Sequence, residues 1–107
     1  MSLLLRASAL ILALAIAPPP AQAADATVEI DNFTFSPAHL VIAPGTRVTW
    51  VNHDDIPHTV YSREAPASRH SPPLDTDDSF SMVFDSPGTY GFFCSLHPHM
   101  QSEIVVR

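Results

Sequence analysis

Three side chains that can bind a metal ion lie within seven residues, from Cys94 to Met100, in the order Cys-x-x-His-x-x-Met. Cys94 offers a thiolate, His97 an imidazole and Met100 a thioether, which is a weak ligand at a longer distance. With a second imidazole, this set matches the trigonal His₂Cys arrangement with an axial Met found in electron-transfer copper sites. His58 is the candidate for the second imidazole. The spacing therefore indicates a small copper-binding redox protein.

Other interpretations of these residues are weaker. A lone buried cysteine usually packs as a small hydrophobic residue, but here the joint spacing favours a metal ligand. Structural zinc prefers several thiolates or a Cys₂His₂ set, whereas thiolate and thioether together favour copper in both oxidation states. His99 is an alternative to His97, although it adjoins Met100, and both side chains would struggle to reach one ion. We expect the remaining candidates to be surface or core residues: His39, His53, His70 and Met82.

The elements that would hold these ligands can be read from the same pattern. Tyr90, Phe92 and Cys94 alternate along one strand, so the thiol should point into the core at the end of that strand. Pro98 and its polar neighbours mark a loop, which would bring the later ligands back toward the sulfur. His58 lies 36 residues before Cys94 and must come from another element. The metal is therefore expected between two elements fixed by the core.

Alternation with period two continues along the chain, and no stretch has a convincing helical stripe. The expected strands are Thr27–Asn32, continued by Phe33–Phe35, then Leu40–Ala43, Arg47–Asn52, Ser79–Phe84, Tyr90–Cys94 and Glu103–Arg107. Residues 62–78 contain three prolines and should form a long surface connection with at most a short helical turn. About seven or eight short strands separated by turn residues indicate an all-β sandwich or barrel.

The first 23 residues resemble a secretory signal peptide. Arg6 precedes the apolar run Ala7–Ala17, and Ala21–Ala23 reads Ala-Gln-Ala, as at a cleavage site. The run is shorter than the roughly 20 residues that cross a bilayer, and Pro18–Pro20 would end a helix. We therefore expect a signal peptide at 1–23, a single domain at 24–107, export to the periplasm and no stable membrane insertion.

The remaining chain has one cysteine, which is unusual for a small exported domain, since such domains often rely on disulfides. The thiol must then be buried, paired with another chain or bound to metal. There is no lysine, and four arginines face eleven acidic residues, giving a formal charge of −7 after residue 23. Nucleic acid is an unsuitable partner for such a surface. A protein with a positive docking face would suit it, and the equal alternative is that the acidic charge only keeps an exported protein soluble.

Several segments together resemble the blue copper proteins, or cupredoxins: Thr49–Asn52, Pro57–Val60, Gly88–Tyr90, Cys94–Met100 and Ile104–Val106. The short ligand loop is most similar to that of amicyanin, whereas plastocyanin and pseudoazurin have a longer gap before the Met. The resemblance implies a Greek-key β-sandwich with one type 1 copper, Cu(I) or Cu(II), bound by His58, Cys94, His97 and axial Met100. Two positions depart from the family pattern. Thr59 stands where Asn is frequent, and His99 stands where amicyanin is usually apolar.

The family implies a monomeric carrier of single electrons between redox proteins, with a cytochrome c-like protein or a dehydrogenase as partner. A copper chaperone or storage module is the alternative function, although such proteins often contain methionine-rich runs, which are absent from this sequence. A copper enzyme would need a second copper site with further histidines. The chain lacks the length and spacing for one, so we expect no enzymatic activity.

Overall fold

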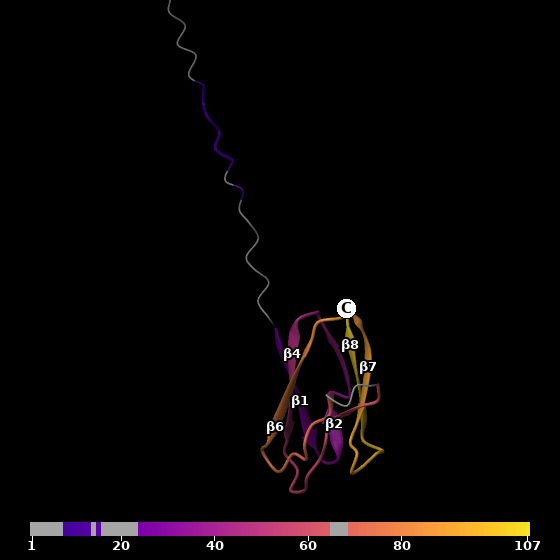
Figure 1. Ribbon diagram of the computed structural model, residues 1–107. Coiled ribbons are helices and arrows are strands. Elements are labelled where there is room, and N and C mark those ends of the chain that lie inside the picture. Colours follow the sequence, from indigo (N-terminus) through magenta and orange to yellow (C-terminus); the bar gives the residue numbers. More distant parts are fainter. Residues whose placement is uncertain (1–7, 14, 16–23, 65–68) are drawn as a thin grey trace, which may run out of the picture.

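The computed structural model describes residues 8–13, 15, 24–64 and 69–107. Two four-stranded sheets pack face to face into a sandwich (Figure 1), with strand orders β2-β1-β4-β6 and β3-β8-β7-β5. The strands are β1 Asp25–Asp31, β2 Thr34–Ser36, β3 His39–Ile42, β4 Thr46–Asn52, β5 Tyr61–Ser62, β6 Ser79–Phe84, β7 Gly88–Phe93 and β8 Gln101–Val106. The described residues contain no α-helix, and the expected all-β sandwich is confirmed.

Alternation along each strand sends one set of side chains into the space between the sheets. Val28 and Ile30 of β1 are buried, as are Val48 and Trp50 of β4. The indole of Trp50 is fully buried, and its ring centroid lies 5.3 Å from that of Phe92 in the opposite sheet. The same alternation makes Phe92 and Cys94 fully buried. The Cys94 thiol is therefore the last inward-facing group in this alternation.

The directions in which the strands pair determine the end of the sandwich at which each strand finishes. β1 runs parallel to β4, and β3 runs parallel to β8, while β7 is antiparallel to β8. As a result β4 and β7 both end at the edge of the sandwich opposite the C-terminus (Figure 1). The segments that follow these two strands contain the predicted ligands, so both ligand segments lie at one end of the molecule.

The prediction that Phe33–Phe35 continues the first strand was wrong. Asn32 and Phe33 have φ angles of 49° and 58°, and they form a tight turn after which β2 folds back antiparallel on β1. Left-handed backbone at both central positions is typical of the two-residue hairpin turn, which usually contains Asn-Gly. Phe at the second position disguised this turn in the sequence.

Two parts of the long connection between β4 and β6 pair with each other at the predicted ligand. The backbone of His58 exchanges two hydrogen bonds with that of Leu74, with N–O distances of 3.1 and 2.7 Å. Ser71 accepts a hydrogen bond from the Val60 amide through its side chain. The short strand β5 within residues 61–62 was not predicted. Residues 65–68, within the predicted surface connection, lie outside the described residues.

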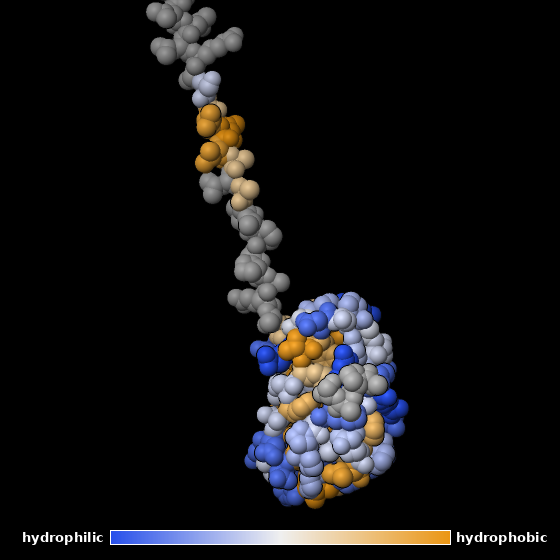
Figure 2. Space-filling view, viewed as in Figure 1, coloured by the Kyte–Doolittle hydropathy of each residue, from blue (hydrophilic) through white to orange (hydrophobic). Residues whose placement is uncertain are grey.

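Most of the predicted signal peptide also lies outside the described residues. Its described part, residues 8–13 and 15, is extended and projects away from the sandwich (Figure 1). Leu10, Ile11 and Leu12 are between 73% and 89% exposed, and Figure 2 shows them as an apolar group separate from the globular part. A search of the described residues found no helix of sufficient length and hydropathy to cross a membrane.

Candidate metal centre

Two buried residues from different segments form the base of the site. Cys94 directly follows β7, and His58 lies between β4 and β5. Both side chains are fully buried. The thiol is there because it continues the inward face of β7, and the imidazole is there because its backbone is paired with Leu74. The expectation that the site lies between two elements fixed by the core is therefore consistent with the structure.

The loop after Cys94 curls back on itself through backbone hydrogen bonds. The Cys94 amide donates to the carbonyl oxygen of Met100 at 3.1 Å, and the Met100 amide donates to that of His97 at 2.9 Å. The Met100 side chain is only 2% exposed, whereas His97 is half-buried. The loop therefore presents one imidazole at the surface and holds the thioether side chain inside.

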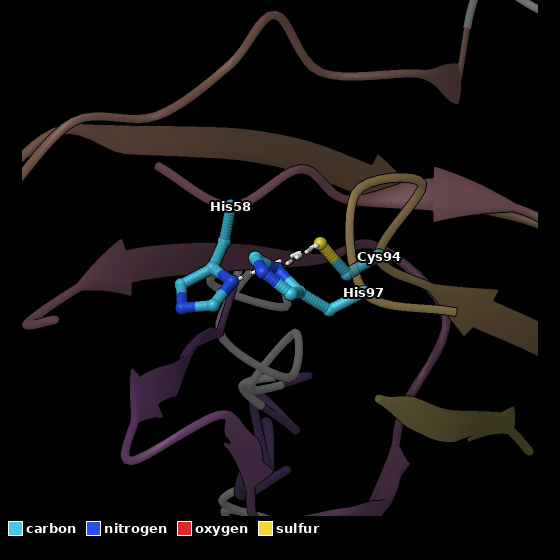
Figure 3. A group of neighbouring side chains, drawn as sticks. All are labelled: His58, Cys94 and His97. Carbon is cyan, nitrogen blue, oxygen red and sulfur yellow. Dashed lines mark hydrogen bonds between the residues drawn. The ribbon is translucent and has the colours of Figure 1, made fainter. Parts of the chain in front are cut away.

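Three donor atoms converge at this end (Figure 3). The Cys94 sulfur lies 3.8 Å from Nδ1 of His58 and 3.8 Å from Nδ1 of His97. All three donor atoms lie within 4.8 Å of one another. Metal–nitrogen distances of about 2.0 Å and metal–sulfur distances of about 2.3 Å, in a trigonal plane, would separate sulfur from nitrogen by about 3.7 Å. The two sulfur–nitrogen separations in the structure are therefore close to those expected around one ion.

The sulfur also accepts hydrogen bonds from Thr59, the residue after His58. The Thr59 amide lies 3.4 Å from the sulfur, and the hydroxyl lies 3.7 Å from it. The same hydroxyl oxygen accepts the Ser95 amide at 2.8 Å and lies 2.7 Å from the Ser95 hydroxyl. Thr59 thus joins the two ligand segments, although the sequence left its role uncertain.

The other ring nitrogen of His58 contacts a carboxylate. His58 Nε2 lies 2.7 Å from Oδ2 of Asp54. Oδ2 also accepts the Phe33 amide, and Oδ1 accepts the Asn32 amide. Burial raises the pKa of Asp54, but hydrogen bonds from the Phe33 amide, His58 and the Asn32 amide, with the charge of His58, outweigh it. The net pKa lies below the ordinary value of 3.8. Asp54 is therefore ionised at neutral pH.

Sequence reasoning did not identify Asp54 or Phe33 as part of this region. Asp54 lay in a polar turn that resembled ordinary surface. The Phe33 ring is 40% exposed and makes T-shaped contacts with both imidazoles, with centroid distances of 5.3 Å to His58 and 5.1 Å to His97. A carboxylate four residues before a candidate ligand was the one available signal.

The other histidines lie away from the three converging donors. His99 is exposed, and its ring centroid is 6.4 Å from that of His97. His39 and His53 are exposed beside acidic side chains, with His39 Nδ1 at 3.3 Å from Glu103. His70 is half-buried and stacks on Tyr61 with a centroid distance of 4.1 Å. In the described part of the chain, one group of three residues has metal-binding spacing, namely His58, Cys94 and His97.

Comparisons with known proteins agree with this geometry. A family model described as a cupredoxin-like domain matches residues 4–106. Amicyanin-alpha of Methylorubrum extorquens is 33% identical over 81% of this chain and 76% of its own length. A purple cupredoxin structure from Nitrosopumilus maritimus has a TM-score of 0.72 and 36% identity, over 78% of this chain and all of that one. A copper-containing nitrite reductase of Thermus scotoductus has a TM-score of 0.71 and 28% identity, over 78% of this chain but only 22% of the reductase.

Proposed function

Because this chain belongs to the cupredoxin-like family, we propose that it is a blue copper protein that carries single electrons between redox partners. His58, Cys94, His97 and Met100 would hold the ion. Copper bound there would supply one-electron chemistry by alternating between Cu(II) and Cu(I). The observation that carries the proposal is the 3.8 Å separation of the sulfur from both Nδ1 atoms. Amicyanins and plastocyanins are electron carriers, in agreement with this assignment.

The chain holds its donors in a fixed arrangement, which suits electron transfer. Asp54 fixes the His58 ring, Thr59 fixes the position of the sulfur, and the backbone of the 94–100 loop fixes His97. Donors held in this way move little when the charge at the centre of the site changes. A small rearrangement lowers the barrier to gaining and losing one electron. Preorganised side chains therefore serve a carrier better than a storage protein, which needs to release its ion.

A carrier is also favoured over an enzyme. The nitrite reductase match covers 22% of that chain, so this sequence corresponds to a small part of the larger enzyme. Within the described residues the group formed by His58, Cys94 and His97 is the one with metal-binding spacing. A copper oxidase or reductase needs a further copper site for its substrate. We therefore assign no catalytic reaction to this chain.

Electrons are proposed to leave through the exposed edge of His97. That imidazole is half-buried, and the adjoining Leu96 is 50% exposed. Apolar surface is visible at this end of the sandwich (Figure 2). The partner is a redox protein, such as a cytochrome c-like protein or a dehydrogenase, whose positive surface complements the acidic chain. The protein acts as a monomer, and nucleic acid is not a partner.

The proposal includes processing and export. Residues 1–23 are a signal peptide, and residues 24–107 form the copper domain in the periplasm. The apolar side chains of Leu10, Ile11 and Leu12 support removal of this segment, because they are largely exposed to solvent and add nothing to the core. Mass spectrometry of the protein purified from the periplasm tests this point, with cleavage after Ala23 as the expected result.

The optical spectrum of the copper-loaded, oxidised protein tests the main proposal. Thiolate-to-copper charge transfer should give an intense visible band that disappears on reduction and returns on reoxidation. Cys94→Ser should lose the band, while Met82→Leu, which alters a Met of β6 outside the ligand loop, should keep it. A colourless wild-type protein would refute the copper assignment. A coloured protein that cannot be reduced and reoxidised rapidly would refute the carrier function and favour storage.

A further inference from the structure

One carboxylate connects the imidazole of His58 to the turn between β1 and β2. Oδ2 of Asp54 lies 2.7 Å from His58 Nε2 and accepts the Phe33 amide at 2.9 Å, while Oδ1 accepts the Asn32 amide at 2.6 Å. The Asp54 side chain is only 11% exposed. Three donors from two segments therefore meet on a single ionised group, and charge-assisted hydrogen bonds of this kind are strong.

The backbone of Asp54 is itself fixed on both sides. Its amide donates to Oδ1 of Asn52 at 3.0 Å, and its carbonyl accepts the Thr76 hydroxyl at 2.7 Å. The amide group of Asn52 donates to the carbonyls of Ile56 and Leu74, each at 2.9 Å. Asn52 is the last residue of β4 and is fully buried. The position of the carboxylate is therefore set by hydrogen bonds that extend from the end of β4.

The carboxylate determines which nitrogen of His58 carries the proton. An ionised carboxylate can only accept, so the neutral ring must place its hydrogen on Nε2. Nδ1 then keeps its lone pair and faces the sulfur of Cys94 at 3.8 Å. Metal-binding histidines commonly donate their second ring nitrogen to a carboxylate, which fixes tautomer and orientation. In this protein Asp54 is placed to accept that hydrogen bond from His58.

The second function of the carboxylate concerns Phe33. A φ angle of 58° is unfavourable for a bulky residue, and glycine would suit this position better. Backbone strain that persists at one residue is often associated with function. The ring stands in T-shaped contact with both His58 and His97, which come from different segments. Hydrogen bonds from the two turn amides to Asp54 hold the backbone in the form that places this ring.

We propose that Asp54 is the positioning residue of this site. It sets His58 in the Nε2–H tautomer, and through the Asn32–Phe33 turn it places the Phe33 ring against both imidazoles. The effect on copper binding rests on the proposed function, whereas the effect on the His58 tautomer stands without it. Asp54 is not one of the four predicted ligands, and predicting those ligands does not by itself assign either role to it.

The tautomer can be measured directly in the copper-free protein. Two-bond ¹H–¹⁵N correlations of the histidine rings, recorded near pH 8, identify the nitrogen that carries the proton. We expect His58 to be the Nε2–H tautomer in the wild-type protein, with that proton protected from exchange. A predominant Nδ1–H form would overturn the proposal. This measurement needs no variant, so it decides the question even if a substitution at Asp54 prevents folding.

Asp54→Asn and Asp55→Asn form a matched pair, because both remove one negative charge from the same loop. Asp55 is exposed, and its side chain has no hydrogen bond to the described residues. An amide offers one acceptor oxygen and an NH₂ donor where the carboxylate offers two acceptors, so Asp54→Asn cannot keep all three hydrogen bonds of the wild-type arrangement. We expect a mixture of His58 tautomers, altered Phe33 ring signals and unchanged spectra for Asp55→Asn.

Copper(I) affinity, measured by competition with a chromophoric chelator, completes the test. Loss of a partner that orients a ligand typically lowers metal affinity about 10- to 100-fold, and we expect Asp54→Asn to fall in this range while Asp55→Asn stays within twofold of wild type. Equal affinities and equal tautomers in the two variants would overturn the proposal. If the wild-type tautomer is as expected but no copper binds, the proposed function fails and the positioning of His58 by Asp54 stands.

Discussion

Around Trp50 the sandwich is filled by rings, whereas around Cys94 the buried groups have specific polar partners. The indole of Trp50 packs among Phe80, Phe84 and Phe92, with centroid distances between 5.3 and 6.4 Å. Its Nε1 has no hydrogen-bond partner among the described residues. At the other end, Thr59 alone has hydrogen bonds to both the sulfur of Cys94 and the Ser95 segment.

This difference separates two tasks within one small domain. Dispersion and apolar burial are not directional, so the core stabilises the fold without specifying the positions of single atoms. Hydrogen bonds depend strongly on distance and angle, so the polar end specifies where the three donor atoms lie. The core should therefore contribute the largest share of the stability without changing the metal chemistry, whereas the polar end should determine where the donor atoms lie and contribute less to stability. Each of the following predictions tests that separation.

The largest effect on stability is expected in the core. Trp50→Ala removes a fully buried indole and should lower the free energy of unfolding of the copper-free protein by about 3–5 kcal/mol. Urea unfolding measures this loss. The visible band of the folded, copper-loaded variant should stay at its wild-type position. Trp50→Phe, which keeps a ring and removes the unpaired N–H, should lose less. A band displaced as far as in a ligand variant would show that the two regions are not separable.

Bound copper should stabilise the folded protein through the end of the sandwich that contains Cys94. An ion that binds only the folded state adds about 2.7 kcal/mol at a free concentration of 100 times Kd. We expect scanning calorimetry to show a higher Tm for the loaded than for the copper-free wild-type protein, and a chelator should reverse the rise. Cys94→Ser should gain much less under the same conditions. An equal gain in the variant would mean that copper stabilises the protein from another site.

The core and the ligand loop could be predicted from sequence because each depends on a local pattern. Alternation along β7 correctly placed Phe92 and Cys94 inside. The spacing from Cys94 to Met100 indicated a ligand loop, and the backbone hydrogen bonds between Cys94, His97 and Met100 are consistent with it. These features depend on neighbours within a few residues, so the sequence contains the whole signal.

The polar connections could not be predicted, because they join segments that are distant in sequence. Asp54 contacts the turn at Asn32, 22 residues earlier, and Thr59 contacts Ser95, 36 residues later. Phe33 was assigned to a strand since only glycine at that position would have signalled the turn. The assignment of His58 as a ligand rested partly on family resemblance, because its distance from Cys94 could not be computed from spacing. Tertiary pairing with Leu74 places it there.

Thr59→Val tests the link between the two ligand segments. Thr59 is buried, and Val has nearly the same shape but cannot accept the Ser95 amide. A buried donor left without a partner costs about 1–3 kcal/mol, and urea unfolding should show a loss of this size. The copper band should persist, because the amide of residue 59 still donates to the sulfur. Thr59→Ser keeps the hydroxyl and should recover most of the lost stability. A valine variant as stable as wild type would show that this link contributes little.

The smallest effect is expected at His99. Its side chain is exposed, and only His97 of the pair has a ring nitrogen 3.8 Å from the sulfur. Substitutions at exposed positions usually change stability by no more than about 0.5 kcal/mol, so His99→Ala should keep both its stability and the copper band. His97→Ala should lose the band or shift it strongly, since one donor of the trigonal set is removed. Optical titration of both variants with copper makes the comparison. The reverse result would be loss of the copper band in His99→Ala and a normal band in His97→Ala. It would identify His99 as the ligand in place of His97 and would mean that the loop rearranges when the ion binds.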